Sequence, residues 1–296
     1  MPRNIPKSFI RPESLEEISQ LLARHDSQSL LYLAGGTDLV LDINERQLPP
    51  CDLLVYLDGI HELKRLRLEE GQLIIGSCVT HQRLAEAPEV RKYLPILAQA
   101  AEVVGCPAIR TMGTVGGNLA RSSPAGDVAT AIQAADAVIH TIGPKGRRAL
   151  SCHEFHLSPR KSVLEPGELI THLSVPVPAD PCGSAFEKLG SRKTMFIASV
   201  SCGALLRLDP ATGRIAEARL CQGSIAPTPV RAPEAEALLL GQEPSEELFQ
   251  AAAEAAREQA RPRTSHRGTS EYRKEMAGIL TLRCLRRALE NAREEA

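Results

Sequence analysis

Two glycine pairs are the segments of this sequence best suited to bind a phosphate group. The first pair lies in AGGTDLV, Ala34–Val40, directly after the apolar run SLLYL. Glycine permits positive φ angles and close approach of the main chain, so consecutive N–H groups here could surround an anion. The sequence has no GxGxxG and no GK[ST], which argues against a standard dinucleotide fingerprint or P-loop. Taken alone, AGGTD is more often a turn than a binding site.

The second pair makes the phosphate interpretation stronger. TVGGN, Thr114–Asn118, places two glycines between hydrogen-bonding side chains, and RSSPAGD follows and ends at Asp127. Two such loops supply what a pyrophosphate with a sugar needs, namely many backbone donors and a few polar side chains. Asp127 could accept a hydrogen bond from a hydroxyl or a ring N–H, or it could be the N-cap of the next helix. Both roles remain open.

Other chemistry-bearing residues give weaker signals. HEFH, His153–His156, has HxxH spacing but poor acidic or cysteine partners for a metal. Lys188 and Arg192, in FEKLGSRK, are either surface charges or part of a site. Eight cysteines are scattered without a CxxC pair, so we predict buried thiols and no metal or iron–sulfur site in this chain. No Ser/His/Asp or Cys/His set indicates a nucleophile.

The elements that would position these residues begin with an α/β pattern. A capping box, Ser14 to Glu17, predicts a helix to about His25. Apolar runs predict strands at Ser29–Ala34 and Cys51–Asp58, which gives a compact β-α-β start. A hairpin then turns at Glu69–Gly71, and a helix is expected from about Glu89 to Val104.

The region after this helix is predicted to be irregular. Gly105–Asp127 is rich in Gly, Pro, Ser and Thr, and is too long for a simple connection. A helix at Val128–Ala135, the strand AVIHTI and the strand HLSVPVP close this part of the chain. After Pro181, three strand patterns precede three helix patterns, which indicates a separate α+β domain. The helix patterns lie at Pro233–Leu240, Ser245–Gln259 and Tyr272–Arg287.

Composition narrows the class of protein. The chain has 296 residues, a formal net charge of −1 and 43% hydrophobic residues, enough for two cores. The sequence has no run of eighteen apolar residues, so it predicts no transmembrane helix. The N-terminus also lacks the apolar core of a signal peptide. A cytoplasmic protein is therefore expected. Near-neutral charge, no Trp and only 3% aromatic residues argue against nucleic acid as a partner.

Taken together, AGGTDL, RTMGTVGGNLARSSPAGD, FEKLGSRK and HRGTSEYRKEMAGILTLR resemble the FAD-binding medium subunit of molybdenum hydroxylases. The resemblance covers almost the whole chain in the same order. It implies a vanillyl-alcohol-oxidase (PCMH)-type FAD-binding domain at 1–176, built of two α/β subdomains at about 1–58 and 59–176. A carbon monoxide dehydrogenase flavoprotein-like α+β domain would follow at 177–296, with the flavin between the two domains.

The resemblance also implies a set of flavin contacts. An aromatic residue that packs on the flavin in xanthine-oxidising relatives aligns with Val104 here, so ring packing must differ. Asp127 would be the acidic contact and Lys188 a lysine near the ring, and an apolar contact would be Ile170 or its neighbour Leu169. The two phosphate loops would be formed by Leu33, Ala34, Gly35, Gly36, Thr37, Asp38 and Leu39, and by Thr114, Val115, Gly116, Gly117 and Asn118.

The implied function is electron relay by FAD. A large molybdopterin subunit would oxidise the substrate, and a small [2Fe–2S] subunit would pass electrons to FAD here and on to NAD or a quinone. We expect a xanthine dehydrogenase-like complex rather than a carbon monoxide dehydrogenase, assembled as a dimer of heterotrimers. Two alternatives stay open: a free-standing FAD-dependent oxidoreductase of the same fold, and a subunit that has lost its flavin.

Overall fold

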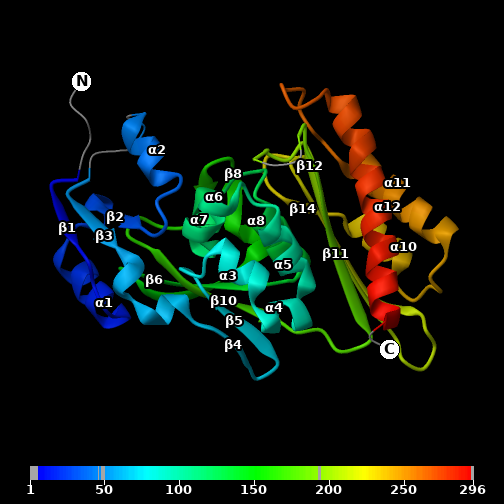
Figure 1. Ribbon diagram of the computed structural model, residues 1–296, viewed down its shortest axis with the longest axis horizontal. Coiled ribbons are helices and arrows are strands. Elements are labelled where there is room, and N and C mark those ends of the chain that lie inside the picture. Colours follow the sequence, from blue (N-terminus) through cyan, green and yellow to red (C-terminus); the bar gives the residue numbers. More distant parts are fainter. Residues whose placement is uncertain (1–5, 46, 48–50, 193–194, 295–296) are drawn as a thin grey trace.

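The computed structural model describes residues 6–45, 47, 51–192 and 195–294. Its N-terminal unit is a small parallel sheet in the strand order β1-β3-β2, with a helix after each of the first two strands (Figure 1). The Ser14 hydroxyl accepts a hydrogen bond from Glu17 N at 3.2 Å, which confirms the predicted helix start. The elements are β1 (Ser8–Ile10), α1 (Leu15–Arg24), β2 (Leu30–Leu33), α2 (Leu39–Asn44) and β3 (Leu53–Tyr56).

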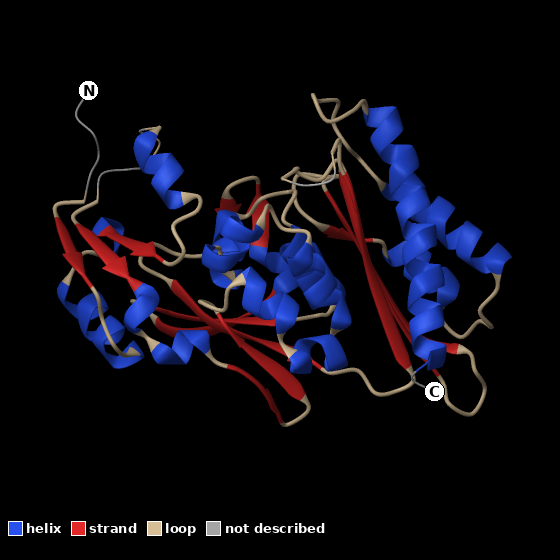
Figure 2. Cartoon of the chain, viewed as in Figure 1, coloured by secondary structure: helices blue, strands red, loops and turns tan. Residues whose placement is uncertain are grey.

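The middle unit is an antiparallel five-stranded sheet, ordered β4-β5-β10-β6-β7, with helices packed against it (Figure 2). Its strands are β4 (Leu66–Glu69), β5 (Gln72–Gly76), β6 (Val138–Gly143), β7 (Gly146–Ser151) and β10 (Leu169–Pro176), beside a small β8 (His156–Ser158) and β9 (Lys161–Ser162) pair. Its helices are α3 (His81–Glu86), α4 (Pro88–Tyr93), α5 (Pro95–Glu102), α6 (Pro107–Met112), α7 (Val115–Arg121), α8 (Asp127–Ala134) and α9 (Cys152–Phe155).

Two sequence predictions for this unit are wrong. The single helix expected at 89–104 is two helices, because Pro95 cannot continue α4 and instead begins α5. The segment 105–127, expected to be irregular, contains α6 and α7. Pro107 occupies the first turn of α6, and the Thr114 hydroxyl caps α7 by accepting a hydrogen bond from Gly117 N at 3.2 Å.

The C-terminal unit is an antiparallel sheet ordered β11-β12-β13-β14, followed by three helices. One side of the sheet meets α5 and α8 of the middle unit, and α12 runs along β11 and β12. The predicted combination of α/β units with an α+β C-terminal unit is confirmed. Its elements are β11 (Cys182–Leu189), β12 (Val200–Leu208), β13 (Ile215–Gly223), β14 (Val230–Arg231), α10 (Pro233–Leu239), α11 (Glu246–Gln259) and α12 (Ser270–Glu294).

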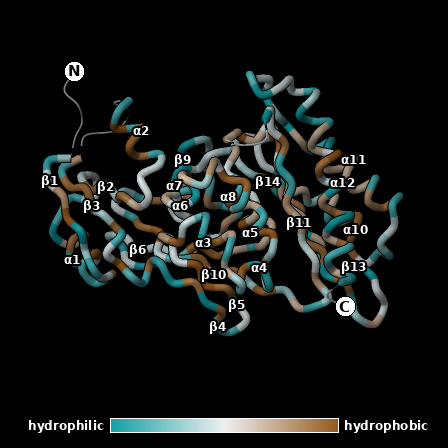
Figure 3. Tube along the Cα trace, viewed as in Figure 1, coloured by the Kyte–Doolittle hydropathy of each residue, from teal (hydrophilic) through white to brown (hydrophobic). Residues whose placement is uncertain are grey.

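Each unit has its own apolar core. Ile18 is fully buried in the N-terminal core, Phe155 in the middle core, and Phe249 is nearly so in the C-terminal core. Figure 3 shows apolar segments along β5 and β10 and between β11 and α12. Among the helices that the structure describes, none is long and apolar enough to cross a membrane.

Candidate functional site

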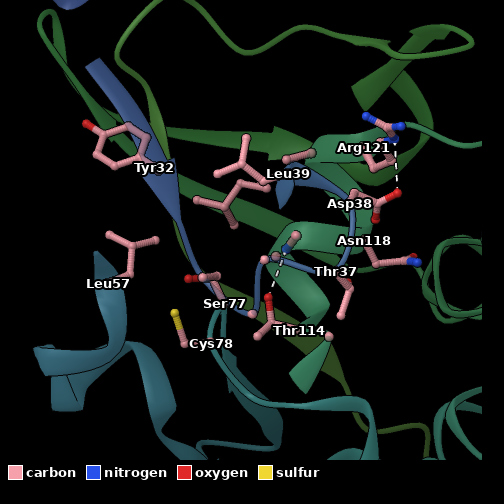
Figure 4. Close-up of a pocket in the computed structure, with 18 of the residues that line it drawn as sticks. Tyr32, Thr37, Asp38, Leu39, Leu57, Ser77, Cys78, Thr114, Asn118 and Arg121 are labelled. Atoms are coloured by element: carbon pink, nitrogen blue, oxygen red, sulfur yellow. Dashed lines mark hydrogen bonds and ion pairs between the residues drawn. The ribbon is translucent and has the colours of Figure 1, made fainter. Parts of the chain in front are cut away.

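A cavity of about 380 Å³ lies where the N-terminal unit meets α7 and the start of β10. Its size is within the range of cofactor and small-molecule sites. Figure 4 shows Tyr32 and Leu57 at one end and Asp38, Asn118 and Arg121 at the other. Twelve of the sixteen predicted site residues line this cavity: Ala34, Gly35, Gly36, Thr37, Asp38, Leu39, Val104, Thr114, Gly116, Gly117, Asn118 and Ile170.

The first glycine segment connects β2 to α2 and presents free backbone donors. Within the described chain, the N–H groups of Gly35, Gly36, Thr37 and Asp38 donate no backbone hydrogen bond. Gly36 has φ +72°, a conformation that residues with a side chain rarely adopt. A Cβ on Gly35 would lie 1.7 Å from the Met112 carbonyl oxygen, so this glycine lets the segment pack directly on the backbone at the end of α6.

The second glycine segment differs, because it is the first turn of α7 and its donors are already used. The N–H of Val115 donates to Val79 O, that of Gly116 to Ser77 O, and that of Asn118 to Thr114 O. The prediction that this segment supplies many free backbone donors is therefore wrong. Gly117 lines the cavity, and a Cβ there would meet one other group, the Thr114 hydroxyl, at 3.1 Å.

Three buried polar atoms on residues that line the cavity have no hydrogen-bond partner among the described residues: Ser77 Oγ, His81 Nδ1 and Asn118 Oδ1. An unpartnered buried polar atom costs roughly 1–3 kcal/mol, so these atoms favour a polar ligand. Burial, and after it the charge of Arg110, lowers the pKa of His81 to about 4, so the imidazole is neutral at pH 7. Free N–H groups and unpartnered atoms together fit an anionic, hydroxyl-bearing cofactor.

Asp127 and Lys188 pair with each other beside the cavity rather than lining it. Lys188 Nζ lies 2.5 Å from Asp127 Oδ2 and 2.9 Å from the Val103 carbonyl, next to cavity-lining Val104. Both side chains are at least 95% buried, and the pair joins α8 to β11. The surface interpretation of Lys188 is therefore wrong. Burial raises the pKa of Asp127 to about 6, and the nearby ammonium opposes that rise.

The alternative role of Asp127 as a helix N-cap is also wrong. Gly126 is the N-cap of α8 and makes no side-chain cap hydrogen bond, while Asp127 is the first helical residue. The remaining two predicted residues, Val115 and Leu33, do not line the cavity. Val115 is fully buried in the middle core, and Leu33 Cδ1 lies 3.1 Å from the position of a Cβ on Gly36.

Sequence reasoning missed several cavity residues that the fold brings in from other segments. Tyr32 donates from its hydroxyl to Gly167 O at 2.8 Å, and Leu57 follows β3. Ser77, Cys78 and His81 follow β5, in a segment for which the sequence patterns gave no prediction of a site. Burial raises the pKa of the Cys78 thiol to about 11, so it is protonated and a poor nucleophile at pH 7.

The weaker candidates do not converge on the site. His153 Nε2 contacts Asp136 Oδ1 at 2.7 Å, whereas His156 Nδ1 contacts the Ser122 hydroxyl at 2.8 Å, so the two rings of HEFH serve different partners. Arg192 is exposed. No group of three or more metal-ligating side chains occurs among the residues that could be described.

Comparison with known proteins agrees with this geometry. Residues 5–178 match the FAD binding domain in molybdopterin dehydrogenase, and residues 184–288 match the CO dehydrogenase flavoprotein C-terminal domain. The chain is 32% identical to a putative xanthine dehydrogenase FAD-binding subunit of Escherichia coli, over 95% of this chain and 96% of the relative. It is 33% identical to the carbon monoxide dehydrogenase medium chain of Hydrogenophaga pseudoflava, over 94% and 95%.

A solved structure shares the whole fold. Carbon monoxide dehydrogenase from Hydrogenophaga pseudoflava, in a form lacking the Mo-pyranopterin moiety, superimposes with a TM-score of 0.90 at 33% identity, covering 98% of this chain and 99% of that chain. Sequence, fold and cavity point the same way, and the chain belongs to the FAD-binding subunits of the molybdopterin-dependent dehydrogenases, the molybdenum hydroxylase family.

Proposed function

We propose that FAD binds in the cavity described above, with its diphosphate against Gly35–Asp38 and the first turn of α7. The free N–H groups of the first segment carry this assignment, because an anion is the ligand that satisfies several consecutive amide donors. Ser77, His81 and Asn118 would supply hydrogen bonds that the described chain leaves unmade. Leu57, Leu169 and Ile170 would pack against an aromatic ring system.

The residues around the site support non-covalent binding. FAD, when bound, supplies the redox chemistry, and the protein supplies position, electrostatics and protection from water. Neither glycine segment contains Cys or His. The fold does bring Cys78 and His81 to the cavity. Because burial keeps the Cys78 thiol protonated, it is not an activated nucleophile. Acid denaturation should release all the flavin into the supernatant, and flavin retained in the pellet would contradict this.

We further propose that the chain is the electron-transfer subunit of a larger complex. It would take electrons from a small [2Fe–2S] subunit, act with a large molybdopterin subunit and pass electrons to NAD or a quinone. The eight cysteines are free thiols, and six of them are buried. No group of three or more metal-ligating side chains occurs among the described residues, so we propose that any iron–sulfur centre is held by another chain. We propose that this complex is a cytoplasmic dimer of heterotrimers and that it resembles xanthine dehydrogenase. The relatives include subunits of both xanthine dehydrogenase and carbon monoxide dehydrogenase.

The decisive experiment is purification of the tagged chain from its native host. We expect it to elute with a small and a large partner, with iron, molybdenum and FAD in the same fraction. A yellow monomer that turns over substrate without iron or molybdenum would instead identify a free-standing FAD-dependent oxidoreductase. A colourless, folded chain in a metal-containing complex would identify a subunit that has lost its flavin.

A further inference from the structure

The short helix α2, which follows the first glycine segment, has little apolar anchorage. Asp42 is its only buried residue, while Val40 and Leu41 are 51% and 56% exposed. Apolar burial normally holds a surface helix in place, since an isolated helix this short is unstable in water. Figure 1 shows α2 standing apart from the N-terminal sheet. Some other interaction must therefore fix α2 and the Gly35–Asp38 segment before it.

Arg121, the last residue of α7, provides that interaction. Its guanidinium pairs with both carboxylate oxygens of Asp42, through Nη1 and through Nη2 at 3.2 Å, and its Nε lies 3.2 Å from Asp38 Oδ1 (Figure 4). The Asp42 side chain is 11% exposed and that of Arg121 23%, so water screens the pair only in part. A bidentate guanidinium–carboxylate pair also fixes direction.

The α7 end of this contact is firmly held. Ser122 follows Arg121 in a left-handed conformation with φ +50°, and its hydroxyl lies 2.8 Å from His156 Nδ1 and 3.0 Å from the Lys161 carbonyl oxygen. Arg121 therefore projects from a fixed point onto a helix that lacks an apolar anchor.

We propose that Arg121, together with Asp38 and Asp42, forms a latch that sets the spacing between the two glycine segments, and that Arg121 is a positioning residue for FAD. The inference rests on the proposed binding of the FAD diphosphate between these segments. Arg121 acts on the cofactor through the carboxylates: all three ends of its guanidinium face Asp38 or Asp42, which also neutralises two acids beside the diphosphate site.

The alternative is that Arg121 binds the diphosphate directly. The two roles predict opposite effects of Asp42→Asn on FAD affinity. If Arg121 were a direct ligand, Asp42→Asn would remove a competing carboxylate and tighten FAD binding. If Arg121 is a latch, Asp42→Asn weakens FAD binding as Arg121→Met does, and the double variant is no weaker than either single variant.

The test measures FAD dissociation constants and amide hydrogen exchange on the full-length chain for Arg121→Met, Asp42→Asn and the double variant. We expect each to weaken FAD by about tenfold, the size of a typical coupling between contacting charged residues. The amides of Val40 and Asp42, which donate to Gly36 O and Asp38 O, should exchange faster in all three. Arg160→Met is the matched control, because Arg160 Nη2 lies 3.6 Å from Asp42 Oδ1 but its side chain is 57% exposed; it should change neither readout.

Tighter FAD binding in Asp42→Asn, or unchanged exchange in α2, would overturn the latch. Gly117→Val separates this failure from failure of the proposed site. If only Gly117→Val loses FAD, the site stands and the latch inference is wrong. If neither Gly117→Val nor the latch variants change FAD affinity, FAD does not bind in this cavity and both proposals fail.

Discussion

The two glycine segments look alike in sequence and are built differently. Gly35–Asp38 is an open connection whose N–H groups make no backbone hydrogen bond within the described chain, whereas Thr114–Asn118 is helical and uses its donors internally. Each pair nevertheless divides its tasks in the same way. A Cβ on Gly35 or Gly116 would meet neighbouring backbone atoms at less than 3 Å, whereas a Cβ on Gly36 or Gly117 would meet only side-chain atoms, the nearest at 3.1 Å. In each pair, therefore, the first glycine is required for packing against a backbone, and the second lines the cavity with only side chains near it.

The largest effect should come from a packing glycine. A Cβ on Gly116 would lie 2.5 Å from Ser77 Cβ and 2.9 Å from Ser77 O, and a backbone cannot move aside as a flexible side chain can. Gly116→Ala should therefore lower the free energy of unfolding by about 3 kcal/mol or prevent folding, at the upper end of the cost of overpacking. Chemical denaturation of the purified chain measures this. A variant of wild-type stability would mean that α7 is not packed on Ser77.

The neighbouring glycine should give the opposite pattern. Gly117→Val adds a side chain on the cavity side, and replacing a helical glycine raises helix propensity, so stability should be kept. FAD affinity should fall by about tenfold to hundredfold, since filling the site costs roughly 1–3 kcal/mol. FAD titration followed by flavin fluorescence measures the affinity, and thermal melting is the control for folding. Stoichiometric FAD at wild-type affinity would remove the second segment from the proposed site.

The stability of the chain should fall in acid, because His81 packs beside the second glycine segment and is buried in its neutral form. His81 donates its backbone N–H to Gly113 O, and burial lowers the pKa of its imidazole from 6.5 to about 4. The unfolded chain then binds the extra proton first, so the stability that neutral His81 contributes is complete above pH 6.5 and declines as the pH falls towards 4. At pH 5 the loss should be about 2 kcal/mol.

The control for this pH dependence is His81→Gln, which cannot titrate. Burial also lowers the pKa values of His156 and His172 to about 4, so part of the acid loss should remain in the variant. Chemical denaturation of the wild type and His81→Gln between pH 7.5 and 4.5 gives the free energy of unfolding of each. The difference between their pH dependences is the contribution of His81. Parallel stability curves would show that His81 does not titrate in this range.

The smallest effect should come from the unpartnered amide of Asn118. Its Oδ1 is buried without a hydrogen bond in the described structure, so Asn118→Ala should not destabilise the FAD-free chain. It should weaken FAD by about tenfold, if one hydrogen bond of about 1–1.5 kcal/mol is lost. Thr111→Ala is a useful comparison, because its hydroxyl already donates to Ala108 O at 3.1 Å and lies outside this cavity. Equal FAD affinity in wild type and Asn118→Ala would leave Asn118 as a wall residue only.

Local signals in the sequence were reliable where short-range geometry decides the structure. The capping box at Ser14 and Glu17 began α1 as predicted, and the strand and helix patterns after Pro181 appear in the expected order. The same rules contained the signals for α5, α6 and α7, namely Pro95, Pro107 and Thr114. The break at Pro95 was missed, and the high content of Gly, Ser, Thr and Pro in 105–127 led to the wrong prediction that α6 and α7 are irregular.

The sequence by itself determined the order of the strands and helices after Pro181, the two glycine pairs and, through resemblance, the family and its cofactor. It could not determine which backbone donors stay free, because that depends on whether Val79 and Ser77 come within reach of α7. Nor could it pair Asp127 with Lys188, or Arg121 with Asp42, residues 61 and 79 positions apart. Burial and the contacts between distant segments decide pKa values and ion pairs, and both exist only once the chain has folded.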